Sequence, residues 1–141
     1  MNSIITHGIE ISVQTHYFAP QSSPKEGHYF FVYEITITNK SEFTVKLLSR
    51  HWDITDCLGQ KRVVEGEGVV GETPTILPNQ SFAYNSGCDF TTEIGKMSGY
   101  YKMQKLVDKT EFNVSIPEFV IQEAKEKNFE IEVKALKQFE L

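Results

Sequence analysis

The chemically most distinctive part of the sequence is a glycine-rich segment, Gly66-Glu67-Gly68-Val69-Val70-Gly71. Its spacing matches the G-x-G-x-x-G pattern of dinucleotide-binding folds, in which glycines let the backbone approach a phosphate and a helix follows. Here Pro74 and Pro78 follow the segment, and prolines at this spacing do not fit the interior of a helix. We therefore reject the Rossmann interpretation and expect a loop.

Without a helix, the amides of such a loop can still converge on an anion. Two arginines precede the loop and can add positive charge. The candidate phosphate-binding residues are therefore Gly66, Gly68, Gly71, Arg50 and Arg62. The alternative is that the glycines serve only tight turns and close packing of the sheet.

Carboxylates crowd the same segment and would oppose an anion. Glu65, Glu67 and Glu72 repel phosphate unless they point away or a divalent cation intervenes. Together with Asp53 and Asp56 they offer the oxygen ligands that Mg²⁺ prefers. None of them has calcium-loop spacing, so we expect solvated carboxylates, no resident metal and no cofactor.

Other constellations that support catalysis or metal binding are weak. The histidines (His7, His16, His28 and His51) and the cysteines (Cys57 and Cys88) lack the spacing of a zinc or redox motif. Ser86-Gly87-Cys88-Asp89 has no recognisable base partner, and no nucleophile elbow occurs. We therefore expect a binding protein and not an enzyme.

Composition excludes several partners. Fourteen basic and nineteen acidic residues give a net charge of −5, which disfavours nucleic-acid binding. The longest apolar and aromatic run, residues 29–33, is far shorter than the roughly 20 residues of a membrane helix. The first residues lack the basic start of a signal peptide. We expect a cytoplasmic protein without membrane insertion.

Alternation of apolar and polar residues with period two dominates the chain and predicts strands. The expected strands cover residues 9–14, 28–38, 44–56, 61–65, 80–87, 98–107 and 111–116. About seven short strands separated by turn residues predict an all-β, immunoglobulin-like or fibronectin-III-like antiparallel β-sandwich. Trp52, the single tryptophan, is the expected core anchor.

The length of 141 residues fits one domain, which we place at residues 1–124. Residues 119–127 are compatible with a strand end or a short helix. Residues 125–141 form a C-terminal tail of undetermined structure, with an added strand as one alternative.

Several motifs occur together in an order that resembles the ApaG family. They are Ser49-Arg50-His51-Trp52-Asp53-Ile54-Thr55-Asp56, the glycine segment through Pro74, Leu77-Pro78, Phe82-Ala83-Tyr84-Asn85-Ser86-Gly87, Gly95-Lys96-Met97-Ser98-Gly99-Tyr100-Tyr101-Lys102-Met103 and Ile116-Pro117-Glu118-Phe119. The resemblance spans roughly residues 4–122. It implies an immunoglobulin or fibronectin-III-like sandwich.

For function, the resemblance implies a link to certain phenotypes and interaction domains, and it does not define a reaction. Bacterial ApaG proteins are linked by phenotype to cobalt resistance and magnesium efflux, and related eukaryotic domains occur in F-box proteins and a polymerase-delta-interacting protein. The glycine loop is regarded in the family as a phosphate or nucleotide site. This sequence departs from the pattern at Asn79, where a glycine commonly follows Pro78.

Two functions remain open from the sequence. The first is a module that binds a phosphate-containing small molecule, with Mg²⁺, at the glycine loop and is indirectly linked to Co²⁺ and Mg²⁺ homeostasis. The second is a protein-interaction module that uses an edge strand or an exposed face with Tyr84, Tyr100 and Tyr101, the loop being structural. An edge strand could also pair with itself and form a homodimer.

Overall fold

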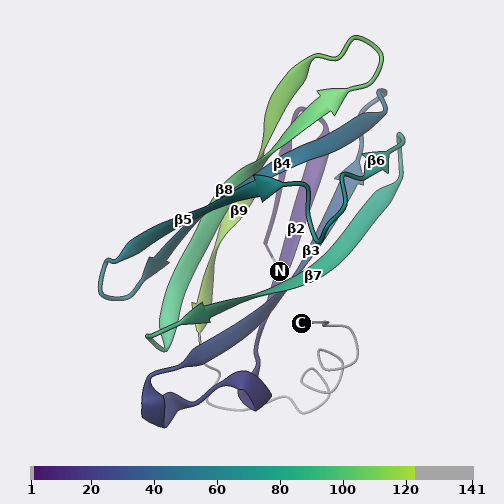
Figure 1. Cartoon of the computed structure of the whole chain (residues 1–141). Coiled ribbons are helices and arrows are strands. Elements are labelled where there is room, and N and C mark those ends of the chain that lie inside the picture. The colour runs from purple at the N-terminus through teal and green to yellow at the C-terminus, as the bar shows by residue number, and fades with distance from the viewer. Residues whose placement is uncertain (1, 123–141) are drawn as a thin grey trace.

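Alternating side chains build two antiparallel sheets that face one another (Figure 1). The computed structural model describes residues 2–122. One sheet contains, in spatial order, β1 (Asn2–Thr6), β2 (Ile9–Tyr17), β3 (Tyr29–Asn39) and β7 (Ser81–Phe90). The other contains β5 (Lys61–Glu67), β4 (Val45–Asp56), β8 (Ile94–Lys105) and β9 (Glu111–Gln122), and β6 (Thr75–Ile76) also pairs with β4.

The predicted fold class, an all-β antiparallel sandwich, is confirmed. Each of the seven expected strands is present, and β1 and β6 are additional. The strand alternative for the segment after Pro117 is correct as far as Gln122. Pro117 is accommodated because β9 lies at the sheet edge and its register with β8 shifts between Met97 and Gly99. The tail at 125–141 lies outside the described residues.

The core lies between the sheets and is centred on Trp52, as predicted. Trp52 is 2% exposed, and its ring makes edge contacts with Tyr33 and Phe119, at centroid distances of 5.3 and 5.9 Å. These rings come from β4, β3 and β9, so the contact joins both sheets. Gly99 lies opposite Trp52 on β8, where an added Cβ would be 2.0 Å from the carbonyl oxygen of His51. The absence of a side chain allows this close approach.

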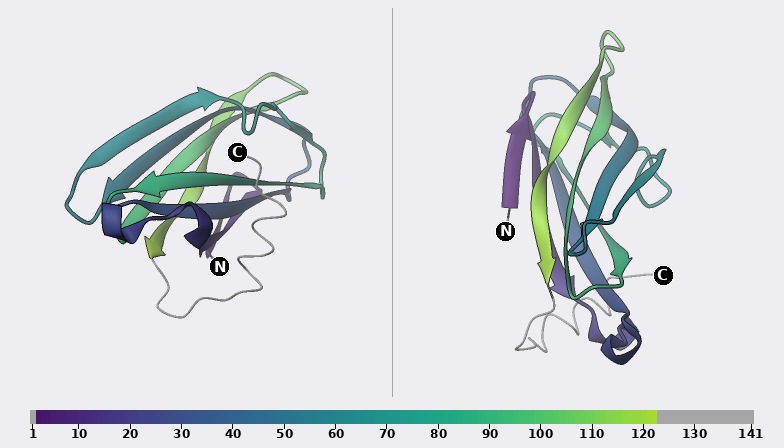
Figure 2. Two further views of the ribbon diagram at one scale, coloured as in Figure 1. Left: turned by 60° about the horizontal axis from the view of Figure 1, so that its bottom comes forward. Right: turned by 90° about the vertical axis from the view of Figure 1, so that its left-hand side faces the viewer.

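The two sides of the sandwich differ. On one side β1 lies against β9: Asn2 Nδ2 donates to the Glu118 carbonyl at 3.1 Å, and the Ser115 amide donates to Thr6 Oγ1 at 3.4 Å. The two further views show these strands next to one another (Figure 2). On the other side the outer strands are β5 and β7, each of which pairs with one strand within residues 2–122. The second side is therefore the open side of the sandwich.

The connections between strands include two short helices and a tight turn at Asn79. Two single-turn 3-10 helices, Ala19–Gln21 and Pro24–Glu26, lie in the connection between β2 and β3. Asn79 has φ +67° at the third position of a turn closed by the Gln80 amide and the Leu77 carbonyl. Asparagine tolerates this left-handed conformation, so it can replace the family's glycine there. Neither helix has the length and hydrophobicity needed to cross a membrane.

Asn39 is the buried polar side chain that joins these connections. Its Nδ2 donates to the carbonyls of Phe43 at 2.7 Å and Ile76 at 3.0 Å. Its Oδ1 accepts from the amide and hydroxyl of Ser41 at 2.9 and 2.6 Å. The residue is 0% exposed, so water cannot replace these bonds. Asn39 thereby holds the β3–β4 turn against β6.

We expect Asn39→Ala to lower the free energy of unfolding by about 2–4 kcal/mol, because it removes the buried hydrogen bonds to the Phe43 and Ile76 carbonyls and those from Ser41. Asn113→Ala, at an exposed position of β9, is the control and should change it by less than about 0.5 kcal/mol. Urea denaturation measures both. Equal losses in the two variants would contradict the role given to Asn39.

Candidate functional site

The glycine segment forms a loop that connects β5 to β6 along the edge of β4. β5 pairs with Ser49 to Thr55 and β6 pairs with Val45 and Lys46, so the segment between them passes Leu47 and Leu48 near the start of β4. It begins where the Gly68 amide donates to the Leu48 carbonyl at 2.9 Å. It then forms a tight turn in which Val69 and Glu72 exchange both backbone hydrogen bonds, at 2.8 and 2.9 Å.

The turn requires unusual backbone angles. Val70 and Gly71 have φ of +43° and +77°, the combination found in type I′ turns. Gly68 has φ +62°, and an added Cβ there would be 2.1 Å from the Glu72 carbonyl oxygen. Gly71 has open space around it. Val70 is a β-branched residue in the left-handed region, which is strained and is typical of functional sites.

Arg50 lies under this loop, on the face of β4 that carries Trp52. Its Nη1 donates to the carbonyls of Glu67 at 3.1 Å and Gly68 at 3.0 Å. The guanidinium crosses Gly66, its partner on β5, where a Cβ would be 2.7 Å from Nη1. Gly66 is therefore needed to make room for the arginine.

The structure brings four of the five predicted residues to this loop and places the fifth elsewhere. Arg62 lies at the other end of β5, roughly 20 Å from Gly68 along the strand. There its Nη2 contacts the Cys88 sulfur at 2.9 Å and lies 3.6 Å from the Asp89 carboxylate. Arg62 thus joins β5 to β7 across the open side.

A pocket of about 310 Å³ opens between the sheets beside Arg50. We call it the Arg50 pocket. Its walls include Tyr33 from β3, Tyr84 and Ser86 from β7, Trp52 from β4, Glu67 from β5, and Val69, Val70 and Gly71 from the loop. Its size falls in the range of sites for small molecules. Sequence analysis missed Tyr33 and Ser86, because only the facing of the two sheets brings them to the loop.

The hydroxyl groups in this pocket stay neutral. Burial raises the pKa of Tyr33, against a smaller opposing effect of its hydrogen bond to Ser86. Burial and the neighbouring Tyr101 raise the pKa of Tyr84 well above its ordinary value. Neutral phenols can donate hydrogen bonds and do not repel an anion. Arg50 therefore provides a positive charge beside uncharged hydroxyls, and the exposed Glu67 is the acidic residue of the pocket wall.

Arg50 also lacks a compensating carboxylate. Within residues 2–122, no carboxylate oxygen lies within 4.0 Å of its guanidinium. Glu65, one of the carboxylates expected to oppose an anion, lies on the opposite face of the sheet from Arg50 and contacts His51. In the part of the chain described, no group of three His, Cys, Asp or Glu side chains is arranged to hold a metal ion.

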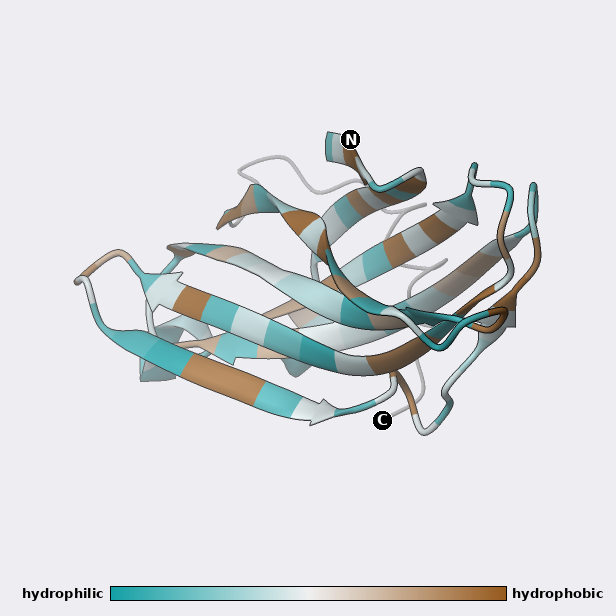
Figure 3. Cartoon of the chain, turned by 90° about the horizontal axis from the view of Figure 1, so that it is seen from above, coloured by the Kyte–Doolittle hydropathy of each residue, from teal (hydrophilic) through white to brown (hydrophobic). Residues whose placement is uncertain are grey.

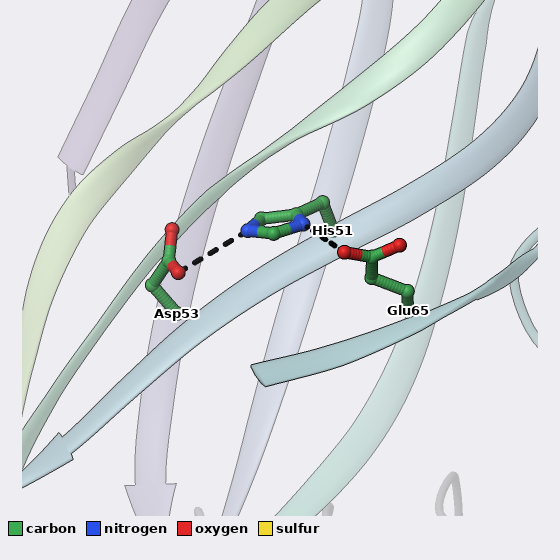
Figure 4. A network of polar contacts seen from close by, with 3 residues as sticks. All are labelled: His51, Asp53 and Glu65. Atoms are coloured by element: carbon green, nitrogen blue, oxygen red, sulfur yellow. Dashed lines mark hydrogen bonds and ion pairs between the residues drawn. The ribbon is translucent and has the colours of Figure 1, made fainter. Parts of the chain in front are cut away.

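The outer face of the same sheet carries a separate polar network (Figure 4). His51 Nδ1 lies 2.9 Å from Glu65 Oε1, and its Nε2 lies 3.2 Å from Asp53 Oδ1. Its ring stacks on Tyr100 at 4.7 Å. Partial burial opposes the charged ring, but the hydrogen bonds that the ring donates to the Asp53 and Glu65 carboxylates, together with their negative charge, outweigh it and raise the pKa of His51. The negative charge here is thus paired with a histidine.

The predicted tyrosine cluster is divided between the core and the surface. Tyr84 and Tyr101 are buried and their hydroxyls bond to one another, whereas Tyr100 is 37% exposed on the outer face. Period-two alternation places the adjacent Tyr100 and Tyr101 on opposite faces of β8. An exposed patch formed by all three tyrosines is therefore not present.

Comparison with known proteins identifies the family. A family model described as the ApaG domain matches residues 19–105. The chain belongs to the ApaG family. Protein ApaG of Brucella canis is 46% identical over 119 residues, covering 84% of this chain and 91% of that protein. Protein ApaG of Shewanella denitrificans is 50% identical over 111 residues, covering 79% and 87%.

Solved structures agree with this assignment. A crystal structure from Bordetella pertussis, a structural genomics target, has 36% identity and a TM-score of 0.80, covering 84% of this chain and 95% of that one. The C-terminal domain of Wzt, at 8% identity and a TM-score of 0.52, shares the fold alone. The solved structures therefore support the β-sandwich fold of this chain.

We expect Gly68→Ala to lower the free energy of unfolding of this ApaG-family protein by at least ~2 kcal/mol, because both the positive φ and the Glu72 carbonyl oppose a Cβ. Gly71→Ala meets only the backbone penalty, about 1–2 kcal/mol. Chemical denaturation of the two variants compares them. A larger loss at Gly71 would show that the loop packing is assigned incorrectly.

We expect His51 to titrate above the unperturbed value of about 6.5, and Glu65→Gln to lower its pKa. Since the folded pKa is raised, the stabilisation from charged His51 is complete below the unfolded pKa and is lost as pH rises through the folded pKa. NMR titration of the histidine ring measures this, with Glu93→Gln in the β7–β8 turn as control. An unchanged His51 pKa in Glu65→Gln would refute the assignment.

Proposed function

We propose that this ApaG-family protein is a non-enzymatic cytoplasmic module that binds a small phosphate-containing anion in the Arg50 pocket. The observation that carries the proposal is the environment of the Arg50 guanidinium. Its guanidinium is half-buried, faces a pocket between the sheets and, among residues 2–122, has no carboxylate within 4.0 Å. A half-buried positive charge without a counter-charge favours binding of an anion.

The glycines support this function by shaping the pocket. Gly66 leaves room for the guanidinium, and the carbonyls of Glu67 and Gly68 orient Nη1. Nη1 is thereby held in place, and a guanidinium has further N–H groups available for an oxyanion. Preorganisation of this kind reduces the entropy lost when a ligand binds.

The backbone amides contribute less than the sequence motif suggested. The amides of Gly68, Val69 and Glu72 already bond to carbonyls within the sheet and the turn. The proposed affinity therefore depends on Arg50 and on the hydroxyls of Tyr33 and Ser86 rather than on a nest of amides.

In this proposal Mg²⁺ is bound by the phosphate-containing ligand and not by the protein. Polyphosphates and nucleotides bind Mg²⁺ through their own oxygens, and Mg²⁺ keeps several waters. A protein that binds such a complex would respond to the supply of Mg²⁺ without holding the metal itself. This is the indirect route by which we connect the module to cobalt and magnesium homeostasis.

A second candidate function is protein interaction, as the internally bonded loop amides and the open side of the sandwich favour it. Because Tyr84 and Tyr101 are buried, the surface for this function would be an edge strand and not a tyrosine-bearing face.

Calorimetric titration with pyrophosphate and with nucleoside triphosphates, each with and without Mg²⁺, tests the anion site. We expect saturable binding to the wild-type protein and a loss of about tenfold to a hundredfold in affinity for Arg50→Gln, the range expected for a charged hydrogen bond. Arg50→Lys keeps the charge but loses the planar fork, so it should be intermediate.

Arg62→Gln is the matched control, since it makes the same change of charge at the other end of β5. It should bind within about twofold of the wild-type protein, well below the effect of losing one charged hydrogen bond. The proposal is wrong if no binding occurs at millimolar ligand, or if Arg50→Gln binds as tightly as the wild type while folded by NMR.

A further inference from the structure

β5 is an exposed strand at the open edge of its sheet, where it appears as an apolar band between polar ends (Figure 3). All five residues from Lys61 to Glu65 are exposed. Val63 and Val64 are 57% and 39% exposed, which is high for β-branched residues in a strand. Proteins usually protect such edges, because an unpaired strand is a template for another strand.

The hydrogen bonds of β5 show which backbone groups are available. The Gly68 amide bonds to Leu48 and the Asp56 amide bonds to Gln60, so the even-numbered residues from 60 to 68 pair with β4. The amides and carbonyls of the odd-numbered residues therefore point away from the sheet. The Glu67 carbonyl accepts from Arg50, which leaves Lys61, Val63 and Glu65 facing the open edge.

The charges of β5 are arranged so that the strand complements itself. Lys61 and Arg62 stand at its beginning, and Glu65 and Glu67 stand at its end, with the two valines between them. When a strand pairs antiparallel with its own copy, its beginning lies opposite the end of the other strand. Each basic end would then face an acidic end, and such cross-strand pairs are stabilising.

One register satisfies both the hydrogen bonds and the charges. Outward-facing residues must pair with outward-facing residues, so a two-fold axis at Val63 places Lys61 opposite Glu65 of the second copy. This register uses only the three residues whose backbone groups are available. An axis at Val64 would place Lys61 opposite Glu67, whose carbonyl already accepts from Arg50.

We propose that this protein forms a homodimer through antiparallel β5–β5 pairing with Val63 on the two-fold axis. The sheets of the two copies become one continuous sheet, and the exposed valines pack against one another. This association is independent of the anion site, because Lys61, Val63 and Glu65 do not line the Arg50 pocket.

The other edges suit self-pairing less well. β1 and β9 cover one another through Asn2, Glu118, Thr6 and Ser115. β7 carries Asp89 as its one charged residue, and this carboxylate lies beside Arg62. Among the strands within residues 2–122, β5 alone combines an open edge, exposed valines and charges of opposite sign at its two ends.

Disulfide trapping tests the register, in a Cys57→Ser background that removes the exposed cysteine. Residues directly opposite in a hydrogen-bonded antiparallel pair have Cα atoms about 5.5 Å apart, which a disulfide can span. We expect Val63→Cys to form a covalent dimer under mild oxidation. Val64→Cys is the matched control and should crosslink at least about tenfold less, because it lies off the axis opposite Arg62 of the second copy. Preferential crosslinking of Val64→Cys would overturn the register.

Sedimentation velocity over micromolar to millimolar protein tests the dimer itself. We expect the dissociation constant to rise about tenfold or more in Lys61→Glu, which replaces two attractive pairs by two repulsive ones. Adding Glu65→Lys should restore dimerisation, and Lys109→Glu, in the exposed β8–β9 turn, should leave it unchanged. A wild-type protein that is monomeric throughout, or a dimer that Lys61→Glu does not weaken, would overturn the proposal.

Discussion

Burial of Trp52 is the constraint on which the other features depend. Its ring contacts Tyr33 and Phe119 across the two sheets, and such aromatic pairs stabilise beyond the area that they bury. Because side chains alternate along a strand, placing Trp52 inside also places Arg50 inside and His51 outside. The core therefore determines which face of β4 each polar residue occupies. Gly99 permits this packing by letting β8 approach the His51 carbonyl.

The two faces of β4 then acquire different electrostatic properties. On the outer face, His51 lies between the carboxylates of Asp53 and Glu65, which raise its pKa and favour its protonated form. On the inner face, Arg50 is held by carbonyls that carry no net charge. A charge that is oriented but not neutralised is costly for folding alone and useful for binding. This difference is why we place the ligand site at Arg50 and not at the larger group of charges outside.

The open side of the sandwich connects the pocket with the edge strand. Contact between β1 and β9 closes one side, whereas among residues 2–122 β5 and β7 do not pair with one another on the other side, where Arg62 reaches Cys88 and Asp89. The pocket lies between the sheets on this open side, and the unpaired backbone groups of β5 lie along its border. One architectural asymmetry thus supplies both surfaces through which this ApaG-family protein can meet a ligand or a second copy.

The sequence by itself determined the fold class, the central tryptophan and most strands, because period-two alternation is a local property of the chain. It missed β1, whose Ile4 and Ile5 are exposed, and β6, which has only two residues. It also grouped Arg62 with Arg50, since both are near the glycines in sequence. Only the tertiary structure separated these arginines, brought Tyr33 and Ser86 to the loop and showed that the amides of Gly68, Val69 and Glu72 are already bonded. These facts depend on strand register and on the facing of the two sheets, which arise from contacts between residues distant in sequence.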